Sequence, residues 1–305
     1  MMLGQAKPIV GGRPAAAHRY PFAVYLSVET QPGWHAVCGG TLVSSRHIVT
    51  AAHCVHKLER AQVVKIGIGS ASVREQAHRQ ARTITVHPQF DAQSLANDIA
   101  VVEVDGSVAQ GAGVRRAPVY FGPVGEGEAV TAMGWGLTSN AAGARTVAVM
   151  NAVELVVADP RRCRAVDRRF ASSNGPFLCT STRPGARDQC SGDSGAPVVI
   201  GLGPSAADLR LVALTSYGDN LQHDDHPPCA DPTGFGFSTH VAYYQHFLTN
   251  ATGLSRAQLE APVRLDRVAL HRYVSAAAAA PMPADACVHA AALALLCALL
   301  FLRHY

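Results

Sequence analysis

The chain has 305 residues, of which 48% are hydrophobic and only 16% are charged. This balance supports a sizeable buried core and excludes a wholly disordered chain. The formal net charge is +4, and no block of lysine and arginine is present, so the sequence gives no support for nucleic-acid binding.

Short β-like runs separated by turn residues fill most of the chain. With 27 glycines and 18 prolines, this pattern predicts many strands joined by turns rather than long helices. Residues 241–248 instead have a helical spacing of apolar residues and are expected to close the unit. The predicted strands cover residues 22–28, 40–43, 63–68, 83–86, 99–104, 129–132, 153–157, 196–200 and 209–216.

The eight cysteines are widely spaced and form no CxxC pair. An even number at such spacing favours disulfides in an oxidising compartment, and buried free thiols are the alternative. Residues 1–7 are too short to hold the apolar core of a signal peptide, so we expect the natural chain to begin further upstream. The cysteines stand at positions 38, 54, 163, 179, 190, 229, 287 and 297.

Three segments carry the parts needed for nucleophilic catalysis. A serine hydroxyl attacks well only when a neighbouring base removes its proton, and histidine suits that task near neutral pH. His53 lies in TAAHC at residues 50–54, Asp98 lies in NDIAVV at residues 97–102 just before an apolar run, and Ser194 lies in DQCSGDSGAP at residues 188–197. Each residue alone is more often a packed, capping or turn residue, but the three segments together, in this order, predict a His–Asp–Ser triad.

The glycines around Ser194 predict a tight turn. Gly192 and Gly195 permit backbone conformations that other residues avoid. Such a turn is expected to aim the N–H groups of Gly192 and Ser194 at one point, which is the geometry that an oxyanion hole requires.

The chain resembles the chymotrypsin–trypsin family of serine proteases over roughly residues 9–252. The resemblance is carried by IVGG at 9–12, TAAHC, NDIA, GWG at 134–136 and CSGDSGAP at 190–197. It implies an all-β fold of two six-stranded antiparallel β-barrels with a short C-terminal helix. His53 and Asp98 would come from the first barrel and Ser194 from the second.

The resemblance also implies three disulfides. Cys38 would pair with Cys54 beside His53, and Cys163 would pair with Cys179. Cys190 would pair with Cys229 and brace the substrate pocket. Cys287 and Cys297 have no counterpart in the family pattern.

The same family pattern predicts the substrate pocket. Asp188, six places before Ser194, would lie at its floor, where a carboxylate pairs with an arginine or lysine of the substrate. The walls would include Ser216, Gly218 and Gly236, whose two glycines leave room for a long side chain. The alternative is that Asp188 is a solvated loop acid.

Activation is expected to follow the family route, in which cleavage frees the Ile9 amino group to pair with Asp193. Residues 1–8 would then be a propeptide remnant. The usual basic residue before the isoleucine is replaced by Pro8, so self-activation is not expected. We expect no cofactor and no metal. The acidic, histidine-rich loop at 219–228 is interpreted as solvated rather than as a cation site.

The C-terminal region changes character after residue 252. Residues 253–285 are interpreted as a linker or stalk, with the low-complexity run SAAAAA. Residues 286–302 form an apolar segment expected to be helical, and three interpretations stay open: a membrane helix, a removable lipid-anchor signal, or a helix packed on the domain. The predicted location is extracellular or at the cell surface.

The predicted function is therefore a serine endopeptidase that cleaves after arginine or lysine. Its expected partners are protein or peptide substrates and protein protease inhibitors, with membrane association through the C-terminal segment. One alternative is a catalytically silent homologue that serves as a binding module. An esterase with a GxSxG turn is disfavoured, because Ala196 stands where that motif needs glycine and the triad order differs.

Overall fold

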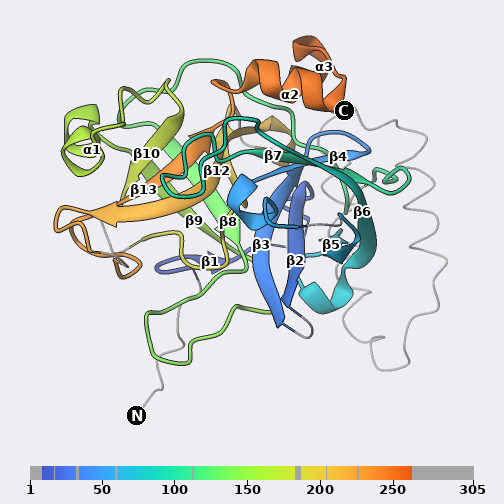
Figure 1. The fold of residues 1–305 in the computed structure, drawn as a ribbon, viewed down its shortest axis with the longest axis horizontal. Helices are drawn as coiled ribbons and strands as arrows, with labels where there is room; N and C mark the ends of the chain where they lie inside the picture. Colours follow the sequence, from blue (N-terminus) through green and yellow to red (C-terminus); the bar gives the residue numbers. More distant parts are fainter. Residues whose placement is uncertain are drawn as a thin grey trace, which may run out of the picture. The chain divides into compact units, whose positions relative to one another are not determined.

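The computed structural model describes one unit built mainly of antiparallel strands, which fall into two barrels (Figure 1). Strands of the first barrel come from the N-terminal half of this unit, and strands of the second barrel follow them in the chain. The predicted fold of two six-stranded antiparallel barrels with a short C-terminal helix is confirmed. The structure describes residues 9–262 except 17, 32–33, 59–60, 112, 183–186, 204 and 225–226.

The first barrel closes in the order β2-β3-β4-β7-β6-β5. Closure leaves no strand edge open in this sheet, so every strand has two neighbours. Alternate side chains point inward, and Leu26, Ile48, Ile66 and Val102 are fully buried in the interior. The strands are β2 (Ala23–Gln31), β3 (Trp34–Leu42), β4 (His47–Thr50), β5 (Val64–Ile68), β6 (Ala77–Val86) and β7 (Ala100–Val104).

The second barrel has the order β9-β10-β13-β12-β11-β8 and closes because β8 also pairs with β9. A two-residue strand, β1 (Arg13–Pro14), adds to β9. The interior again holds aliphatic side chains, including Val130, Leu178 and Val198. The strands are β8 (Ala129–Gly134), β9 (Asn151–Val157), β10 (Phe177–Ser181), β11 (Pro197–Gly201), β12 (Leu209–Asn220) and β13 (Gly234–His240).

The barrels pack on each other through a shared apolar cluster. Val49 and Val101 contribute from the first barrel, and Met133 and Leu214 contribute from the second. Gly39 of β3 lies against Ala196, so closely that a Cβ at position 39 would come within 2.4 Å of the Ala196 Cβ. The two halves are therefore in direct contact next to the residues singled out above.

In the described part of the chain, three α-helices accompany the barrels. In α1 (Pro160–Val166), the Asp159 side chain caps the first turn and proline occupies the first position. The predicted closing helix appears as α2 (Gln245–Thr252), which ends at Gly253 in a left-handed conformation. Short 3₁₀ turns occur at Ala52–Cys54, Ala61–Val63, Val73–Glu75 and Ala206–Asp208.

The ordered chain continues beyond residue 252 into α3 (Arg256–Glu260). Ser255 and Gln258 form a reciprocal capping box at its start. Leu259 is fully buried, and its carbonyl accepts a hydrogen bond from the Val119 N–H at 2.9 Å. The region predicted as a linker from residue 253 thus begins with a helix that packs on the domain.

Three disulfides join the six cysteines of the described residues. They are Cys38–Cys54, Cys163–Cys179 and Cys190–Cys229, which confirms the predicted pairing. Cys287 and Cys297 lie outside the described residues.

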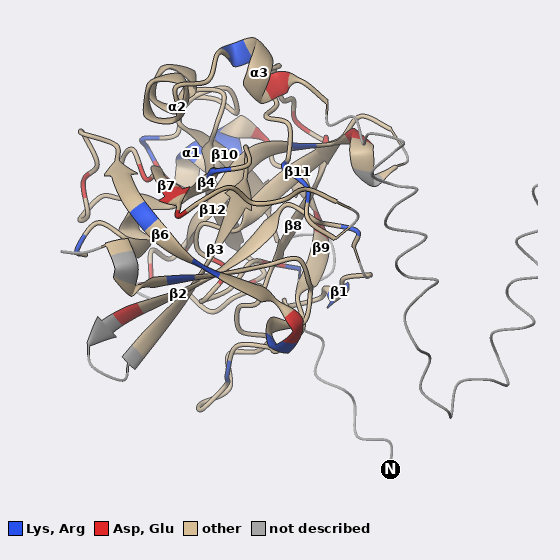
Figure 2. Ribbon diagram, turned by 90° about the vertical axis from the view of Figure 1, so that its right-hand side faces the viewer, with Lys and Arg blue, Asp and Glu red and all other residues tan. Residues whose placement is uncertain are grey.

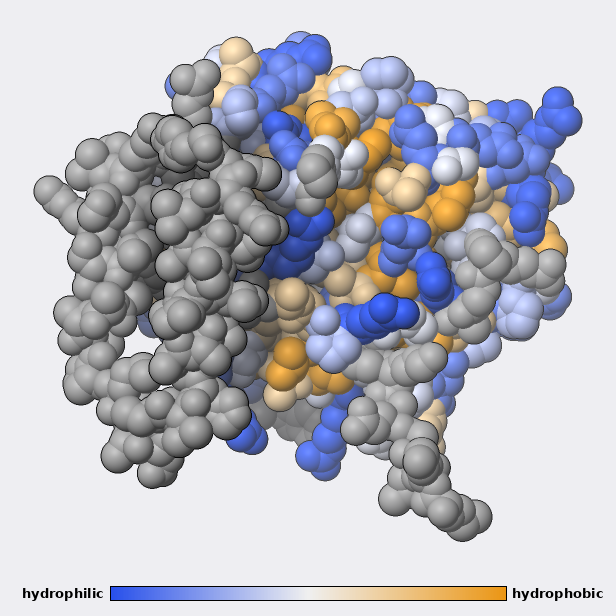
Figure 3. Space-filling view, turned by 180° about the vertical axis from the view of Figure 1, so that it is seen from behind, coloured by the Kyte–Doolittle hydropathy of each residue, from blue (hydrophilic) through white to orange (hydrophobic). Residues whose placement is uncertain are grey.

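Charged positions of both signs are scattered over strands and loops (Figure 2). On the face seen from behind, hydrophobic residues occur in small groups between hydrophilic ones (Figure 3). No helix in the described part of the chain is long and apolar enough to cross a bilayer. The apolar segment at 286–302 lies outside that part.

Replacing Leu259 with alanine tests whether α3 belongs to the folded unit. Because Leu259 is fully buried, Leu259→Ala should lower the free energy of unfolding by about 2–5 kcal/mol. Glu260→Ala, which removes only an exposed ion pair with Arg256, should change it by less than about 1 kcal/mol. Denaturant unfolding of both variants provides the measurement, and equal effects would contradict the packing of α3.

Candidate active site

The Asp98 carboxylate and the His53 imidazole form a buried pair. Asp98 is fully buried, and its Oδ2 lies 2.8 Å from His53 Nδ1. Its Oδ1 accepts a second hydrogen bond from the His53 backbone N–H at 2.8 Å. An ionised carboxylate can only accept hydrogen bonds, so this contact places a proton on Nδ1 and leaves the Nε2 lone pair unprotonated. The His53 side chain is 24% exposed, so the pair reaches solvent only through its imidazole.

The second barrel also holds Asp98. The Ser216 hydroxyl donates to Asp98 Oδ2 at 2.5 Å, and the Thr239 hydroxyl donates to the Asp98 carbonyl oxygen at 2.9 Å. Ser216 was predicted only as a pocket wall, and no sequence pattern indicates this second contact. The acid is thus fixed by groups from both barrels.

The Ser194 loop packs on the strands that lead to His53. The Ser194 carbonyl accepts a hydrogen bond from the Gly39 N–H at 2.7 Å, and Cys54 Sγ lies 3.7 Å from the same oxygen. Gly195 has φ +75°, and a Cβ there would come within 2.2 Å of Thr50 Oγ1. The positive φ and the close contact with Thr50 explain why position 195 requires glycine, as the sequence predicted. Within the described chain, the Ser194 hydroxyl makes no hydrogen bond to the imidazole in this structure.

Two backbone donors in this loop have no hydrogen-bond partner among the described residues: the N–H groups of Gly192 and Ser194. Gly192 adopts φ +95°. The Ser191 carbonyl, on the same peptide unit as the Gly192 N–H, accepts from the Leu137 N–H at 2.8 Å. Since a trans peptide directs its C=O and N–H to opposite sides, this bond turns the Gly192 N–H away from Leu137. Both donors are available to a ligand oxygen.

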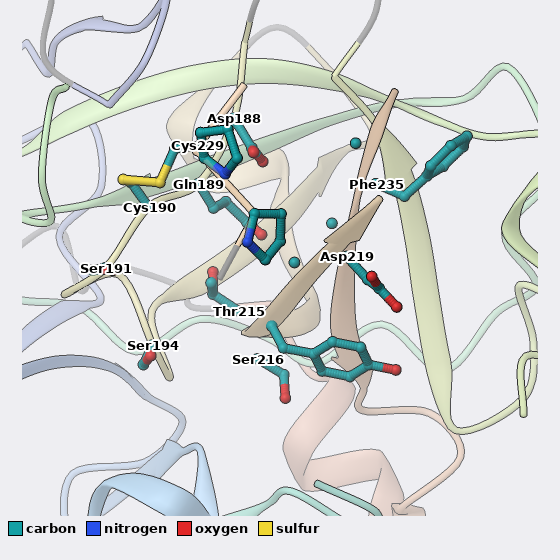
Figure 4. A pocket seen from close by; sticks show the side chains of 16 residues that line it. Asp188, Gln189, Cys190, Ser191, Ser194, Thr215, Ser216, Asp219, Cys229 and Phe235 are labelled. Atoms are coloured by element: carbon teal, nitrogen blue, oxygen red, sulfur yellow. A yellow bond between two sulfur atoms is a disulfide. The ribbon is translucent and has the colours of Figure 1, made fainter. Parts of the chain in front are cut away.

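A cavity of about 330 Å³ lies beside Ser194. The four predicted pocket residues, Asp188, Ser216, Gly218 and Gly236, all line it together with Ser194. Figure 4 shows the Asp188 carboxylate at the opposite end of the cavity from the Ser194 hydroxyl. The structure thus brings the sequence-predicted pocket residues together next to the predicted nucleophile.

Burial strongly affects the Asp188 carboxyl. Desolvation raises its pKa to about 6, although hydrogen bonds from the Ala230 and Gln189 N–H groups oppose the shift. The Ala230 N–H donates to Asp188 Oδ2 at 2.8 Å. Asp188 makes no ion pair with the described residues. A bound cation would remove the cost of ionising this group.

Asp193 is the second strongly buried acid, with 1% of its surface exposed. Its Oδ1 accepts from the Gly136 N–H at 2.8 Å and its Oδ2 from the Cys190 N–H at 2.9 Å. Burial still raises the pKa of this carboxyl to about 7. A Cβ at Gly134 or Gly136 would approach Asp193 to 2.2 or 2.6 Å, which explains why glycines flank the tryptophan in GWG.

The segment that begins at Ile9 is inserted in the second barrel. The Ile9 side chain is fully buried among the aliphatic residues of that barrel. The Val10 carbonyl accepts a hydrogen bond from the Asp188 N–H at 3.0 Å. Residues 9 and 10 therefore contact the same region as the pocket floor.

Tyr217 and Phe237 belong to segments expected in the pocket wall, whereas Asp167 and Arg169, which hold Tyr217 in place, were not assigned roles from the sequence. The Tyr217 ring stacks on Phe237 at 5.0 Å between centroids, and its hydroxyl donates to Asp167 at 2.5 Å. Burial and the Asp167 carboxylate raise the pKa of Tyr217. Arg169 binds the same carboxylate at 2.6 Å. These contacts fix Tyr217, which lines the cavity. Its contacts with Asp167 and Phe237 join residues too far apart in the chain for a local pattern to indicate them.

No group of three or more histidine, cysteine, aspartate and glutamate side chains in the described part of the chain could hold a metal ion. In the loop at 219–228, Asp219 pairs with His223 at 3.5 Å. Asp225 and His226 lie outside the described residues.

Comparison with known proteins agrees with this architecture. The family model for trypsin matches residues 9–248. A trypsin of Phaedon cochleariae is 30% identical over 80% of this chain and 88% of its own length, and a trypsin of Simulium vittatum is 30% identical over 72% and 86%. Transmembrane protease serine 11C of Mus musculus is 28% identical over 81% of this chain and 54% of its own length.

The family match spans both barrels and every predicted site residue from Ile9 to Gly236. The barrel topology and the three disulfides are consistent with the match. The chain therefore belongs to the chymotrypsin–trypsin family and is a trypsin-like serine endopeptidase.

Proposed function

We propose that the chain hydrolyses peptide bonds with Ser194 as the nucleophile, His53 as its general base and Asp98 as the orienting acid. The observation that carries this proposal is the buried Asp98–His53 contact of 2.8 Å beside the Ser194 loop. Because the contact holds the proton of the neutral imidazole on Nδ1, the Nε2 lone pair is available to accept the serine proton. If the proton of the neutral imidazole were on Nε2 instead, His53 could not act as a base toward Ser194.

The reaction has two steps in this proposal. Ser194 Oγ attacks the substrate carbonyl carbon while its proton passes to His53 Nε2, and the imidazolium then protonates the leaving amine. Water next hydrolyses the acyl-enzyme by the same route in reverse. The N–H groups of Gly192 and Ser194 stabilise the oxyanion that forms in each step. The serine–imidazole hydrogen bond, absent in the resting structure, forms when the substrate is bound.

Triad variants test this mechanism. Ser194→Ala should lower kcat by about 10⁶-fold and Asp98→Asn by about 10⁴-fold, the latter because an amide favours the wrong imidazole tautomer. Ser172→Ala, at an exposed serine outside the cleft, should leave kcat unchanged. The assay is amide hydrolysis with enzyme that begins at Ile9.

A serine-directed phosphonate provides a second readout for the same variants. It should modify Ser194 in the unchanged enzyme and should fail to modify Ser194→Ala. Absence of an adduct on correctly processed wild-type protein would contradict the mechanism and favour a catalytically silent homologue.

The substrate is proposed to bind along the open edge of β12 with an arginine or lysine side chain in the cavity. β11 pairs with β12 only as far as Leu214, and Thr215 still bonds to the residues just before β11. The cavity-lining residues of β12 from Ser216 onward therefore have an edge free of β11. A peptide backbone can add to such an edge as an extra strand. The Asp188 carboxylate at the far end then pairs with the cationic side chain of the residue before the cut.

Asp188→Asn tests this specificity. Leaving a buried cation without its partner costs about 2–5 kcal/mol, which corresponds to a loss of roughly 30- to 5,000-fold in kcat/KM. This loss should affect substrates with arginine or lysine before the cut and should spare those with phenylalanine or leucine. Fastest cleavage after phenylalanine or leucine by the wild-type enzyme would contradict the proposal.

Cleavage before Ile9 is proposed to activate the enzyme. In a chain that continues into Pro8, residue 9 has no charged amino group, and burial keeps the Asp193 pKa near 7. Freeing the α-ammonium supplies a cation for this carboxylate, and the resulting pair stabilises the loop that carries Gly192 and Ser194. The activating protease is one that accepts Pro8 before the cut.

The pH dependence of stability follows from the raised Asp193 pKa. In the uncut chain, the folded state holds this proton up to about pH 7 whereas the unfolded state releases it near pH 3.8. Uncut protein therefore loses stability as pH rises from about 4 to about 7. In the cut chain Asp193 is already ionised and paired with the α-ammonium. The cut chain therefore does not lose stability through Asp193 as the pH rises from about 4 to about 7.

Thermal unfolding of the two forms between pH 4.5 and 10 measures the effect. The stability advantage of the cut chain should grow with pH up to about 7 and should decline again once the α-amino group, with an unfolded pKa of about 8, loses its proton in the folded state. Asp193→Asn in the uncut chain should abolish the slope due to this group. Parallel pH profiles of the cut and uncut forms would contradict the pairing.

The proposed location is extracellular or at the cell surface. Three disulfides among the described residues support an oxidising compartment. Protein protease inhibitors that insert a lysine or arginine loop into the same cleft are the proposed partners besides substrates. Cell fractionation with and without residues 286–302 tests the proposed membrane association, which would be refuted by equal release of both forms.

A further inference from the structure

The residue next to Asp188 contributes a second polar group to the cavity. Gln189 is only 8% exposed and lines the cavity with Asp188. Its Oε1 accepts a long hydrogen bond of 3.4 Å from the Ser238 hydroxyl. Its Nε2 is buried without a hydrogen-bond partner among the described residues. The described residues thus leave this carboxamide incompletely satisfied.

The carboxamide oxygen and the carboxylate converge on one side of Gly236. A Cβ placed at Gly236 would lie 3.5 Å from Gln189 Oε1, 3.7 Å from Asp188 Oδ1 and 3.1 Å from Thr180 Oγ1. Figure 4 shows the Gln189 oxygen between the Asp188 carboxylate and the Ser194 hydroxyl. A side chain that enters past Ser194 therefore meets the Gln189 oxygen before it reaches the end of the cavity.

Lysine and arginine differ in what they offer to this arrangement. An ammonium is a compact charge with three donors that diverge from one nitrogen, so it can bind oxygens that surround a point. A guanidinium is longer and planar, and its fork matches two acceptors in one plane, as in a carboxylate. The acceptors around Gly236 come from separate residues, and one of them, the neutral Gln189 Oε1, lies nearer to Ser194 than the Asp188 carboxylate does (Figure 4). This arrangement suits the shorter ammonium.

We propose that Gln189 makes this cavity select lysine over arginine in the residue before the cut, by accepting a hydrogen bond from the ammonium while Asp188 supplies the charge. The inference rests on the proposed function of the cavity as a site for basic side chains. The Gln189 side chain also occupies space that a longer, planar group would need on its way to Asp188. The charge-assisted bond at Oε1 offsets the cost of the unpartnered Nε2.

Peptide amides that differ only in lysine or arginine before the cut test the selection. The wild-type enzyme should give a kcat/KM about tenfold higher for lysine, the ratio expected for one charge-assisted hydrogen bond. Gln189→Met keeps the length of the side chain and removes the acceptor. This variant should lose about tenfold on lysine substrates and should change little on arginine substrates.

Gln189→Ser tests the effect of the size of the glutamine side chain, since a serine is short and leaves room for a guanidinium. It should raise kcat/KM for arginine relative to wild type. A wild-type enzyme that prefers arginine, or a Gln189→Met enzyme that keeps the lysine preference, would overturn the inference. Titration of Ser194 with a serine phosphonate corrects each rate for the fraction of folded, active enzyme.

Competitive inhibitors give a readout that does not depend on turnover. Butylamine should inhibit the wild-type enzyme more strongly than butylguanidine, and Gln189→Met should bring the two inhibition constants close together. If the enzyme instead cleaves after phenylalanine or leucine and neither cation inhibits it, the proposed basic specificity fails, and this inference fails with it. Equal inhibition by both cations, with cleavage after both lysine and arginine, overturns the inference alone.

Discussion

The Asp98 carboxyl is buried where the two barrels meet, and the geometry of the site depends on it. Removing a carboxylate from water is costly unless hydrogen bonds replace its hydration. Here the first barrel supplies both nitrogen donors of His53, and the second supplies the Ser216 hydroxyl. The imidazole is therefore oriented only when both barrels are folded and packed together, which couples the proposed chemistry to the whole fold.

Close backbone approach makes the rest of the site possible. The Ser194 loop lies so near β3 and Thr50 that only glycine fits at position 195, and Asp193 lies so near Gly134 and Gly136 that a Cβ on either would collide with its carboxylate. The result is a closely packed loop in which the N–H groups of Gly192 and Ser194 have no partner among the described residues. The same loop carries Asp193, which pairs with the freed Ile9 amino group in the proposed activation, so in this proposal the oxyanion geometry and activation share one structural element.

Much of this arrangement was predictable from the sequence, because short motifs specify backbone features. The strand runs, the helix near residue 245, the disulfide pairs and the grouping of His53, Asp98 and Ser194 segments all follow from local patterns or from the family resemblance. Contacts between distant side chains were not predictable: the Ser216–Asp98 bond and the contacts of Tyr217 with Asp167 and Arg169. These depend on rotamers and on strand packing across the barrels, which no periodicity in one segment encodes. The packed helix α3 was also missed, because its short, charged sequence resembles a linker.

Nitrogen-15 NMR of the His53 imidazole tests the central claim most directly, because it reads the position of the proton on the ring. In processed enzyme at a pH where this imidazole is neutral, the account predicts that Nδ1 carries the proton toward Asp98 and that Nε2 is unprotonated. Asp98→Asn should shift the population toward the Nε2–H tautomer. A neutral His53 with its proton on Nε2 in the unchanged enzyme would contradict the account.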